Sequence, residues 1–257
     1  MIRSLFQRQA QAPRDDRPPP RVPDGQRVYV IGDIHGCADL LQTAHEQIEA
    51  DAQDNAPDRV KIIYLGDYID RGTSSYETLE LLTTPGPANF DRVFLKGNHE
   101  VMLESFLLEP ETGASWRHYG GMETLQSYRV DIHQGLAQGG LQALAEEFRD
   151  KIPSTHLEFF QQLLAATEIG DYFFCHAGVR PGTPLERQRE DDLLWIRREF
   201  LTSDENFGKI VVHGHTVTEL PEFRPNRINI DTGAYMSGTL TCLVLESDNQ
   251  RIIYARR

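Results

Sequence analysis

The stretch 60–72 (VKIIYLGDYIDRG) decides the fold, because it joins an apolar run typical of a buried β-strand to a glycine turn that carries Asp67. Four further segments repeat this order of apolar run, sharp turn and polar side chains that can bind metal. They are 32–36 (GDIHG), 97–100 (GNHE), 176–178 (HAG) and 213–216 (HGHT). Because turns after parallel strands meet at the C-terminal edge of a sheet, the segments predict one shared metal site there.

The rest of the chain alternates between helical and strand patterns, which is typical of an α/β protein. Apolar spacing predicts helices at 38–50, 74–82 and 100–108. Apolar runs predict strands at 28–31, 60–65, 93–95, 172–175, 210–212, 227–230, 239–245 and 251–254. The polar pair Asp248-Asn249 predicts a hairpin turn between the last two strands.

The chain divides into an arm and one domain. Residues 1–26 contain Pro18-Pro19-Pro20 among polar residues and predict an extended or disordered N-terminal arm. Residues 27–257 form a domain that carries all the turn segments. Within it, 109–164 lacks such turns and shows helical segments near 141–148 and 156–164, so we interpret it as a helical insertion. Two roles stay open for it, a lid over the cleft or a layer that packs on the sheet.

Charge and composition exclude several classes of protein. The formal net charge of −13 argues against a protein that binds nucleic acid, since that needs a basic surface. No apolar run reaches the ~18 residues of a membrane-spanning helix, and the N-terminus does not resemble a secretory signal. Cys37, Cys175 and Cys242 lie far apart in apolar or motif segments. We expect them to be reduced and buried, which favours the cytoplasm.

The turn segments supply enough ligands for two metal ions. Asp33 and His35 are two residues apart, so an extended backbone would point both side chains to the same face. Asp67 can give one carboxylate oxygen to each of two ions and bridge them. We predict one ion bound by Asp33, His35 and Asp67, and a second bound by Asp67, Asn98, His176 and His215. Oxygen and imidazole ligands without thiolate favour two divalent ions in a catalytic site, manganese first, with iron or zinc as alternatives.

Three residues beside these ligands remain for the chemistry. His99 follows Asn98 and cannot easily bind the same ion, so we predict that it is a general acid. Asp70 can hold the far nitrogen of His99 and keep the ring protonated, and Arg71 can bind phosphate oxygens with its planar fork. Two metals lower the pKa of a bound water for in-line attack. The set predicts phosphomonoester hydrolysis by direct attack of metal-bound hydroxide on phosphorus.

These motifs resemble a known family. GDxHG, GDxxDRG and GNHE, matched here without a mismatch, are the pattern of the phosphoprotein phosphatase branch of the calcineurin-like metallophosphoesterases. The resemblance spans residues 27–254, and the chain is most similar to the compact bacterial and lambda-phage type serine/threonine protein phosphatases. These share HAG, a Gly-His-Thr and the IDTGA found here at 230–234. The resemblance implies a four-layer fold with a central β-sandwich flanked by helices and the metals at one edge.

The resemblance also assigns individual residues. His215 precedes a threonine, as the family's ligand does, whereas His213 occupies a position often filled by a residue that is not a ligand. The family uses a second phosphate-binding arginine, for which 191–200 (DDLLWIRREF) offers Arg197 or Arg198. Arg197 is favoured because it follows Trp-Ile, as in bacterial relatives.

The resemblance to eukaryotic members is weaker at the C-terminus. They place a tyrosine near the phosphate, and Tyr235 is a loose counterpart without an assigned role. The loop and tail through which they bind regulators are too short here, so we expect no regulatory subunit.

The leading hypothesis is a protein phosphatase that acts on phosphoserine and phosphothreonine, with phosphotyrosine as a further substrate. Its partner is then a phosphorylated protein or peptide. The alternative is a hydrolase of bis(5′-nucleosyl) tetraphosphates or of another small phosphoester, in which 109–164 would have to build a nucleoside pocket. A noncatalytic phosphate-binding module would lack a ligand or the acid, and the sequence lacks neither.

Overall fold

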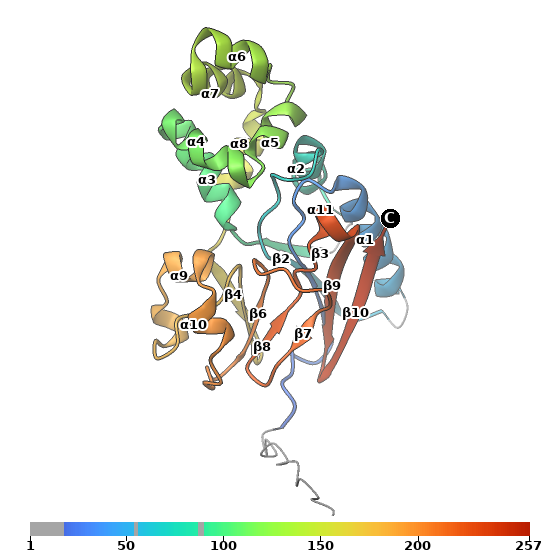
Figure 1. Cartoon of the computed structure of the whole chain (residues 1–257). Helices are drawn as coiled ribbons and strands as arrows, with labels where there is room; N and C mark the ends of the chain where they lie inside the picture. The colour runs from blue at the N-terminus through green and yellow to red at the C-terminus, as the bar shows by residue number, and fades with distance from the viewer. Residues whose placement is uncertain (1–17, 54–55, 87–89) are drawn as a thin grey trace, which may run out of the picture.

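Two β-sheets packed face to face form the centre of the molecule, with helices on their outer sides (Figure 1). The computed structural model describes residues 18–53, 56–86 and 90–257. Within these residues each sheet has five strands, in the orders β10-β9-β1-β2-β3 and β4-β5-β6-β8-β7. The predicted α/β class with a central sandwich flanked by helices is confirmed.

The first sheet places three of the turn segments side by side. Its strands are β1 (Gln26–Ile31), β2 (Arg59–Tyr64), β3 (Phe90–Phe94), β9 (Thr239–Glu246) and β10 (Asn249–Arg256). β1, β2 and β3 are parallel, and β9 and β10 join as antiparallel strands. At the ends of the parallel strands, Ile31 pairs with Tyr64 and Tyr64 with Phe94. The turns that follow therefore start at the same edge.

Alternating side chains explain why the first sheet is covered on both faces. In β1, Val28 and Val30 lie in the apolar cluster between the two sheets, whereas Tyr29 and Ile31 pack in the cluster under the helices. The helices that connect the parallel strands are α1 (Ala38–Gln53) and α2 (Ser75–Thr83). α1 turns Leu40, Leu41, Ala44 and Ile48 inward at helical spacing.

The second sheet carries the remaining two turn segments. Its strands are β4 (Ala166–Ile169), β5 (Tyr172–Cys175), β6 (Ile210–His213), β7 (Glu222–Phe223) and β8 (Arg227–Asn229). β5, β6 and β8 are parallel, so the ends of β5 and β6 also point to one edge. The helices α9 (Glu190–Trp195) and α10 (Arg198–Leu201), after a 3-10 turn at Leu185–Arg187, cover its outer face.

The segment predicted as an insertion is helical throughout and forms the lobe above α2 in Figure 1. It follows α3 (Asn98–Leu108) and comprises Pro110–Thr112, α4 (Gly113–Trp116), Arg117–Tyr119, α5 (Gly121–Ser127), α6 (Ile132–Gln138), α7 (Gly140–Lys151) and α8 (Ser154–Gln161). Phe106, Phe148 and Phe159 belong to the same buried cluster as the side chains under the first sheet. The lobe is therefore continuous with the core.

Several local predictions were wrong or incomplete. The last hairpin turns at Ser247 and Asp248, one residue earlier than predicted, and Ser247 takes a positive φ of 50° there. The short strands β4 and β7 and the one-turn helix α11 (Ala234–Ser237) were not predicted. These elements have two to four residues, too few for a periodic pattern.

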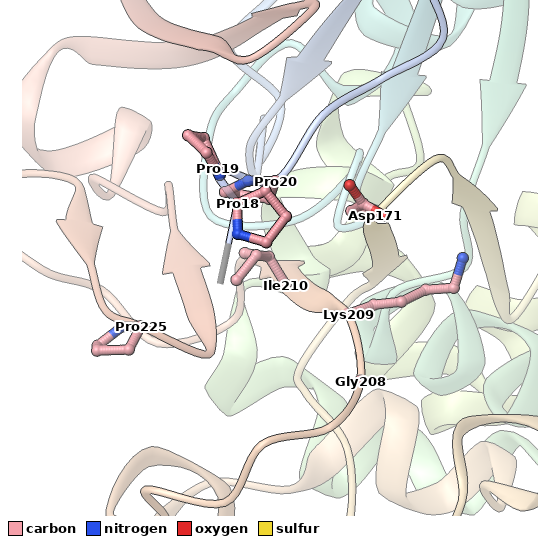
Figure 2. Close-up of a pocket in the computed structure, with 8 residues that line it drawn as sticks. All are labelled: Pro18, Pro19, Pro20, Asp171, Gly208, Lys209, Ile210 and Pro225. Carbon is pink, nitrogen blue, oxygen red and sulfur yellow. The ribbon is translucent and has the colours of Figure 1, made fainter. Parts of the chain in front are cut away.

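Part of the predicted N-terminal arm packs against the sandwich. Residues 1–17 lie outside the described residues. Val22 is buried between the sheets and its N–H donates to Ser247 O at 2.9 Å, while Arg21 N–H donates to Asp171 Oδ2 at 2.9 Å. Figure 2 shows the hollow beside this segment, which is lined by Pro18, Pro19, Pro20, Asp171, Gly208, Lys209, Ile210 and Pro225.

Two further sequence expectations concern environment. Cys37, Cys175 and Cys242 are free thiols and all are buried, as predicted. Among the described residues, no helix has the length and apolar character needed to span a membrane.

Candidate active site

The turn segments hold unusual backbone conformations. His35, Asp67, Asp70, Arg71 and His215 all have positive φ, between 46° and 72°. Such values are strained for residues other than glycine and cluster at functional sites. The prediction that Asp33 and His35 point to one face because the backbone is extended was wrong, since His35 has φ 46°. The turn itself, not strand alternation, directs this imidazole.

Asp67 lies at the centre of the predicted ligands. Its Oδ2 is 3.5 Å from His35 Nε2 and 3.4 Å from His176 Nε2. His176 Nε2 is in turn 2.9 Å from Asn98 Oδ1 and 3.1 Å from His215 Nδ1. The structure therefore brings four of the predicted ligands together around the carboxylate of a fifth, Asp67, from the ends of both sheets. Two groups that share Asp67 have the spacing to hold an ion, namely His35, Asp67 and His99, and Asp67, His176 and His215.

Asp33 lies beside these groups and belongs to neither of them. Its Oδ2 accepts the N–H of His215 at 2.9 Å, and its Oδ1 is buried without a partner among the described residues. Gly214 passes so close that a Cβ there would lie 1.9 Å from Asp33 Oδ1. A bound cation would satisfy this unpaired, buried carboxylate oxygen.

Backbone carbonyls fix the tautomers of two histidines. His35 Nδ1 lies 2.9 Å from Ile69 O, and His176 Nδ1 lies 2.9 Å from Leu65 O. A carbonyl can only accept, so each Nδ1 carries the hydrogen and each Nε2 presents a lone pair toward Asp67. This is how proteins orient histidines that bind metal.

The electrostatics also fit two cations. Burial, and after it the charges of neighbouring carboxylates, raise the pKa of Asp33 and of Asp67 well above the usual range. Burial lowers the pKa of His176 to about 3, and it lowers the pKa of His35 and of His215 as well. A buried carboxylate without a counter-charge costs free energy, and a divalent cation would offset that cost. A neutral imidazole is the form of histidine that binds a metal ion. The residues present therefore fit a two-metal centre.

Glu100 supports this centre, although no role beyond its place in GNHE was predicted for it. Its buried carboxylate accepts the N–H groups of Gly97, Asp67 and Tyr68, each at 2.9 Å. It thereby joins the turn after β3 to the turn after β2. Gly97 is required because a Cβ there would lie 2.2 Å from Asp67 Oδ1.

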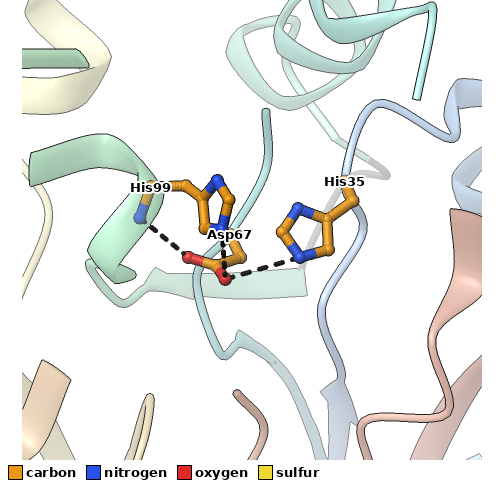
Figure 3. A group of neighbouring side chains, drawn as sticks. All are labelled: His35, Asp67 and His99. Atoms are coloured by element: carbon orange, nitrogen blue, oxygen red, sulfur yellow. Dashed lines mark hydrogen bonds and ion pairs between the residues drawn. The ribbon is translucent and has the colours of Figure 1, made fainter. Parts of the chain in front are cut away.

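His99 and Asp70 form the predicted pair. His99 Nδ1 lies 2.7 Å from Asp70 Oδ2, and both side chains are buried. However, burial raises the pKa of Asp70 to about 7 and lowers the pKa of His99 to about 3, with the charges of Arg71 and Arg197 adding to the latter effect. The role of Asp70 in keeping the ring protonated therefore stays a prediction, since burial alone acts against it. Figure 3 shows that His99 also faces Asp67, with its Nε2 3.8 Å from Asp67 Oδ2.

Two further side chains hold Asp70, and both come from the helical insertion. Trp116 Nε1–H donates to Asp70 Oδ2 at 2.6 Å, and Thr124 Oγ1–H donates to Asp70 Oδ1 at 2.6 Å. Neither residue was predicted as functional. Trp116 is not part of a recognisable motif, and the sequence does not indicate which distant carboxylate accepts its hydrogen bond.

The two arginines predicted to bind phosphate line a cavity beside the predicted metal ligands. A cavity of about 160 Å³ is lined by His35, Asp67, Arg71, Asn98, His99, Tyr119, Trp195, Arg197, His215, Val217 and Asp231. Arg71 and Arg197 are the two arginines of this lining in the described part of the chain, and the exposed Arg198 is not part of it. The predicted preference for Arg197 over Arg198 thus agrees with its position.

Tyr235 and His213 take different places. The hydroxyl of Tyr235 accepts a hydrogen bond from Arg71 Nη1, and the guanidinium also lies 4.9 Å from the centre of the tyrosine ring. Tyr235 therefore positions Arg71, a contact across 164 residues of sequence that no local pattern reveals. His213 is buried with its ring edge-on to Phe200 at 5.0 Å and lies outside both ligand groups, and the expectation that it is not a ligand stays a prediction.

Comparisons with known proteins show the family of the chain. The family model of the calcineurin-like phosphoesterases matches residues 26–238, and the chain belongs to this family. It is 31% identical over 229 residues to serine/threonine-protein phosphatase 2 of Salmonella typhimurium, which covers 84% of this chain and 91% of that protein. It is 26% identical over 235 residues to the asymmetrical bis(5′-nucleosyl)-tetraphosphatase PrpE of Bacillus thuringiensis, which covers 83% of this chain and 88% of that protein.

A solved structure supports the same fold. The protein serine/threonine phosphatase of Saccharomyces cerevisiae with similarity to human phosphatase PP5 superposes with a TM-score of 0.55 at 17% identity, covering 93% of this chain and 84% of that one. The protein is thus a metallophosphoesterase, a hydrolase that acts on phosphoesters.

Proposed function

We propose that this chain is a protein serine/threonine phosphatase that hydrolyses phosphomonoesters, with phosphotyrosine as a further substrate. The observation that carries the proposal is the cavity of about 160 Å³ over Asp67, with Arg71 and Arg197 in its lining. Pockets that enclose a drug-sized ligand have about 300–1,000 Å³. The cavity therefore suits a single phosphoryl group, and the rest of the substrate would lie outside it, as a protein chain does.

The proposed ligands are Asp33, His35 and Asp67 for one ion and Asp67, Asn98, His176 and His215 for the other, with manganese as the first candidate metal and iron or zinc as alternatives. When bound, the two ions supply a nucleophilic water and positive charge for the phosphoryl oxygens. His99 belongs to the same group as His35 and Asp67, with Nε2 3.8 Å from Asp67 Oδ2, so it is a further candidate ligand of the first ion.

The chain's own side chains would divide the remaining work. Arg71, held by Tyr235, and Arg197 would bind the oxygens of the phosphoryl group. His99 keeps Nδ1 against Asp70 and turns Nε2 to the cavity, from where it would give its proton to the departing serine or threonine oxygen. A bound phosphate dianion adds negative charge beside this ring, which favours its protonated form.

The setting proposed for this reaction is the cytoplasm, with a phosphorylated protein or peptide as partner. Three free, buried cysteines support a reducing compartment. The net charge of −13 supports a protein partner over a nucleic acid, and we propose no membrane partner and no regulatory subunit.

Hydrolysis of a bis(5′-nucleosyl) tetraphosphate is the second candidate. Tyr119 and Trp195 line the cavity and are 45% and 42% exposed, so they offer flat apolar surfaces on which nucleobases stack. Against it, a polyphosphate chain carries several negative charges, and the cavity lining offers two arginines among the described residues.

A substrate panel separates the two candidates. Metal-free protein is loaded with manganese and given phosphoserine, phosphothreonine and phosphotyrosine peptides alongside diadenosine tetraphosphate. We expect kcat/KM for the phosphoserine and phosphothreonine peptides to exceed that for the dinucleotide by about tenfold or more, a difference of about 1.4 kcal/mol in transition-state binding. Preferred turnover of the dinucleotide would overturn the protein phosphatase proposal in favour of the second candidate.

A further inference from the structure

The helical insertion contacts the acid pair directly. We propose that Trp116 and Thr124 are positioning residues that hold Asp70, and through it His99, in the orientation needed to protonate the leaving oxygen. This inference rests on the proposed role of His99 as general acid. It gives the insertion a third role, beyond a lid or a packing layer.

The carboxylate of Asp70 is fixed by three donors. Its Oδ2 accepts from Trp116 Nε1 at 2.6 Å and lies 2.7 Å from His99 Nδ1, and its Oδ1 accepts from Thr124 Oγ1 at 2.6 Å. Asp70, Trp116, Thr124 and His99 are all buried, with exposed fractions of 0 to 2%. With both oxygens engaged, the carboxylate cannot rotate, so the His99 ring that bonds to it is also held.

Thr124 holds the backbone of Asp70 as well. Asp70 N–H donates to Thr124 Oγ1 at 2.9 Å and to Ser75 Oγ at 3.1 Å. Asp70 has φ 72°, a conformation that costs about 1–3 kcal/mol for a residue other than glycine and persists only where the surroundings impose it. The hydroxyl of Thr124 therefore fixes both the strained backbone and the side chain of one residue.

The connection between α4 and α5 crosses directly over this turn. Arg71 N–H donates to Gly120 O at 3.3 Å, and a Cβ on Gly120 would lie 2.2 Å from Arg71 N. Gly120 itself has φ 99°. Trp116 precedes and Thr124 follows this close approach by four residues each, so the two donors reach Asp70 from both sides of the crossing.

Two substitutions remove the groups that bond to Asp70, Thr124→Val with little change of shape and Trp116→Phe with a smaller ring at a buried position. Trp116→Phe loses the indole N–H and keeps an aromatic ring against Phe106, which lies 5.0 Å away. Thr124→Val loses the hydroxyl, and Thr124→Ser restores it. Thr78→Val is the matched control, because Thr78 is buried on α2 and its hydroxyl has no hydrogen-bond partner in the described part of the chain.

The experiment compares two kinds of phosphomonoester. An alkyl phosphate, such as a phosphoserine peptide or phosphoserine itself, needs a proton on its leaving oxygen, whereas 4-nitrophenyl phosphate has a leaving group that is stable without one. We expect Trp116→Phe and Thr124→Val to lower kcat for alkyl phosphates by roughly 10- to 100-fold, less than the complete loss of a general acid, with KM nearly unchanged. For 4-nitrophenyl phosphate kcat should fall by less than about threefold, because its leaving group needs no proton. Thr124→Ser should recover most of the loss.

A second readout does not depend on turnover. The proton on His99 Nδ1 should give a downfield NMR resonance in the metal-free protein, and Trp116→Phe and Thr124→Val should shift or broaden it while Thr78→Val does not. Equal losses with both kinds of substrate, accompanied by lower thermal stability, would show that the two residues only pack, and would overturn the inference. So would full activity and an unchanged resonance in both variants.

The same substrates applied to His99→Asn keep this test separate from the proposed function. If His99→Asn loses alkyl phosphate turnover selectively and the two positioning variants do not, the inference alone fails. If His99→Asn shows no dependence on the leaving group, the proposed acid role fails and the inference falls with it.

Discussion

The strand-end turns and the helical insertion contribute to one site in different ways, the turns with predicted ligands and the insertion with side chains that hold Asp70. The turns that carry Asp67, His176 and His215 bring ligand atoms within 3.1–3.4 Å of each other through short loops fixed to the two sheets. The insertion contributes Trp116 and Thr124, which bond to Asp70, and Tyr119, which lines the cavity. If His99 is the proposed acid, a site whose predicted ligands come from the sheets also depends on the helical lobe for the geometry of its proton donor.

The largest expected effect lies in the strand-end turns. Asp67→Asn keeps the shape of the side chain and removes the charge that both metal groups share. We expect metal content to fall and kcat to drop by about 10³-fold or more, since the ions supply several kcal/mol of charge stabilisation. Metal analysis of the purified variant, beside initial rates with manganese added, measures both. Retention of full metal content and activity would contradict the central place of Asp67 in the site.

His99 lies where the two regions meet, because it is the second residue of α3, directly after a strand-end turn, and its ring contacts Asp70. His99→Asn should lower kcat by roughly 10²–10⁴, the range for loss of a general acid. Metal content should stay at the wild-type value. Loss of one ion together with activity would instead assign His99 to the metal group that also holds His35, which its spacing permits.

The two regions also differ in how far the sequence predicted them. Short turns after parallel strands leave few conformations, so the order of the motifs was enough to predict that Asp67, Asn98 and His176 meet. The sequence could not predict how His35 reaches this centre, because that depends on a left-handed turn. It also could not predict that burial, together with the charges of Arg71 and Arg197, lowers the pKa of His99.

In the insertion, the sequence predicted helices and little about their contacts. The predicted helix at 141–148 corresponds to Gly140–Lys151, and that at 156–164 begins at Ser154 and ends at Gln161. The bonds from Trp116 and Thr124 to Asp70 join residues 46 and 54 positions apart, across separate elements. Such contacts follow from tertiary packing and leave no periodic pattern in the sequence.

The smallest expected effect tests whether the insertion can be weakened without harm to the site. His156 is buried, with Nδ1 2.7 Å from the hydroxyl of Tyr128 and Nε2 2.9 Å from Glu80 Oε1, so it links α8 to the end of α5 and to α2. Tyr128→Phe removes one of these bonds and should lower the free energy of unfolding by about 1–2 kcal/mol, because it leaves a buried nitrogen unpaired. Urea denaturation measures the loss, with Tyr76→Phe as the control, since its ring also touches Tyr128 and its hydroxyl makes no hydrogen bond within the described residues.

Turnover of the folded Tyr128→Phe protein should match the wild type, because its contact lies outside the bonds to Asp70. A fall in kcat for alkyl phosphates at full metal content would show instead that the whole lobe, and not two of its side chains, sets the position of the acid pair.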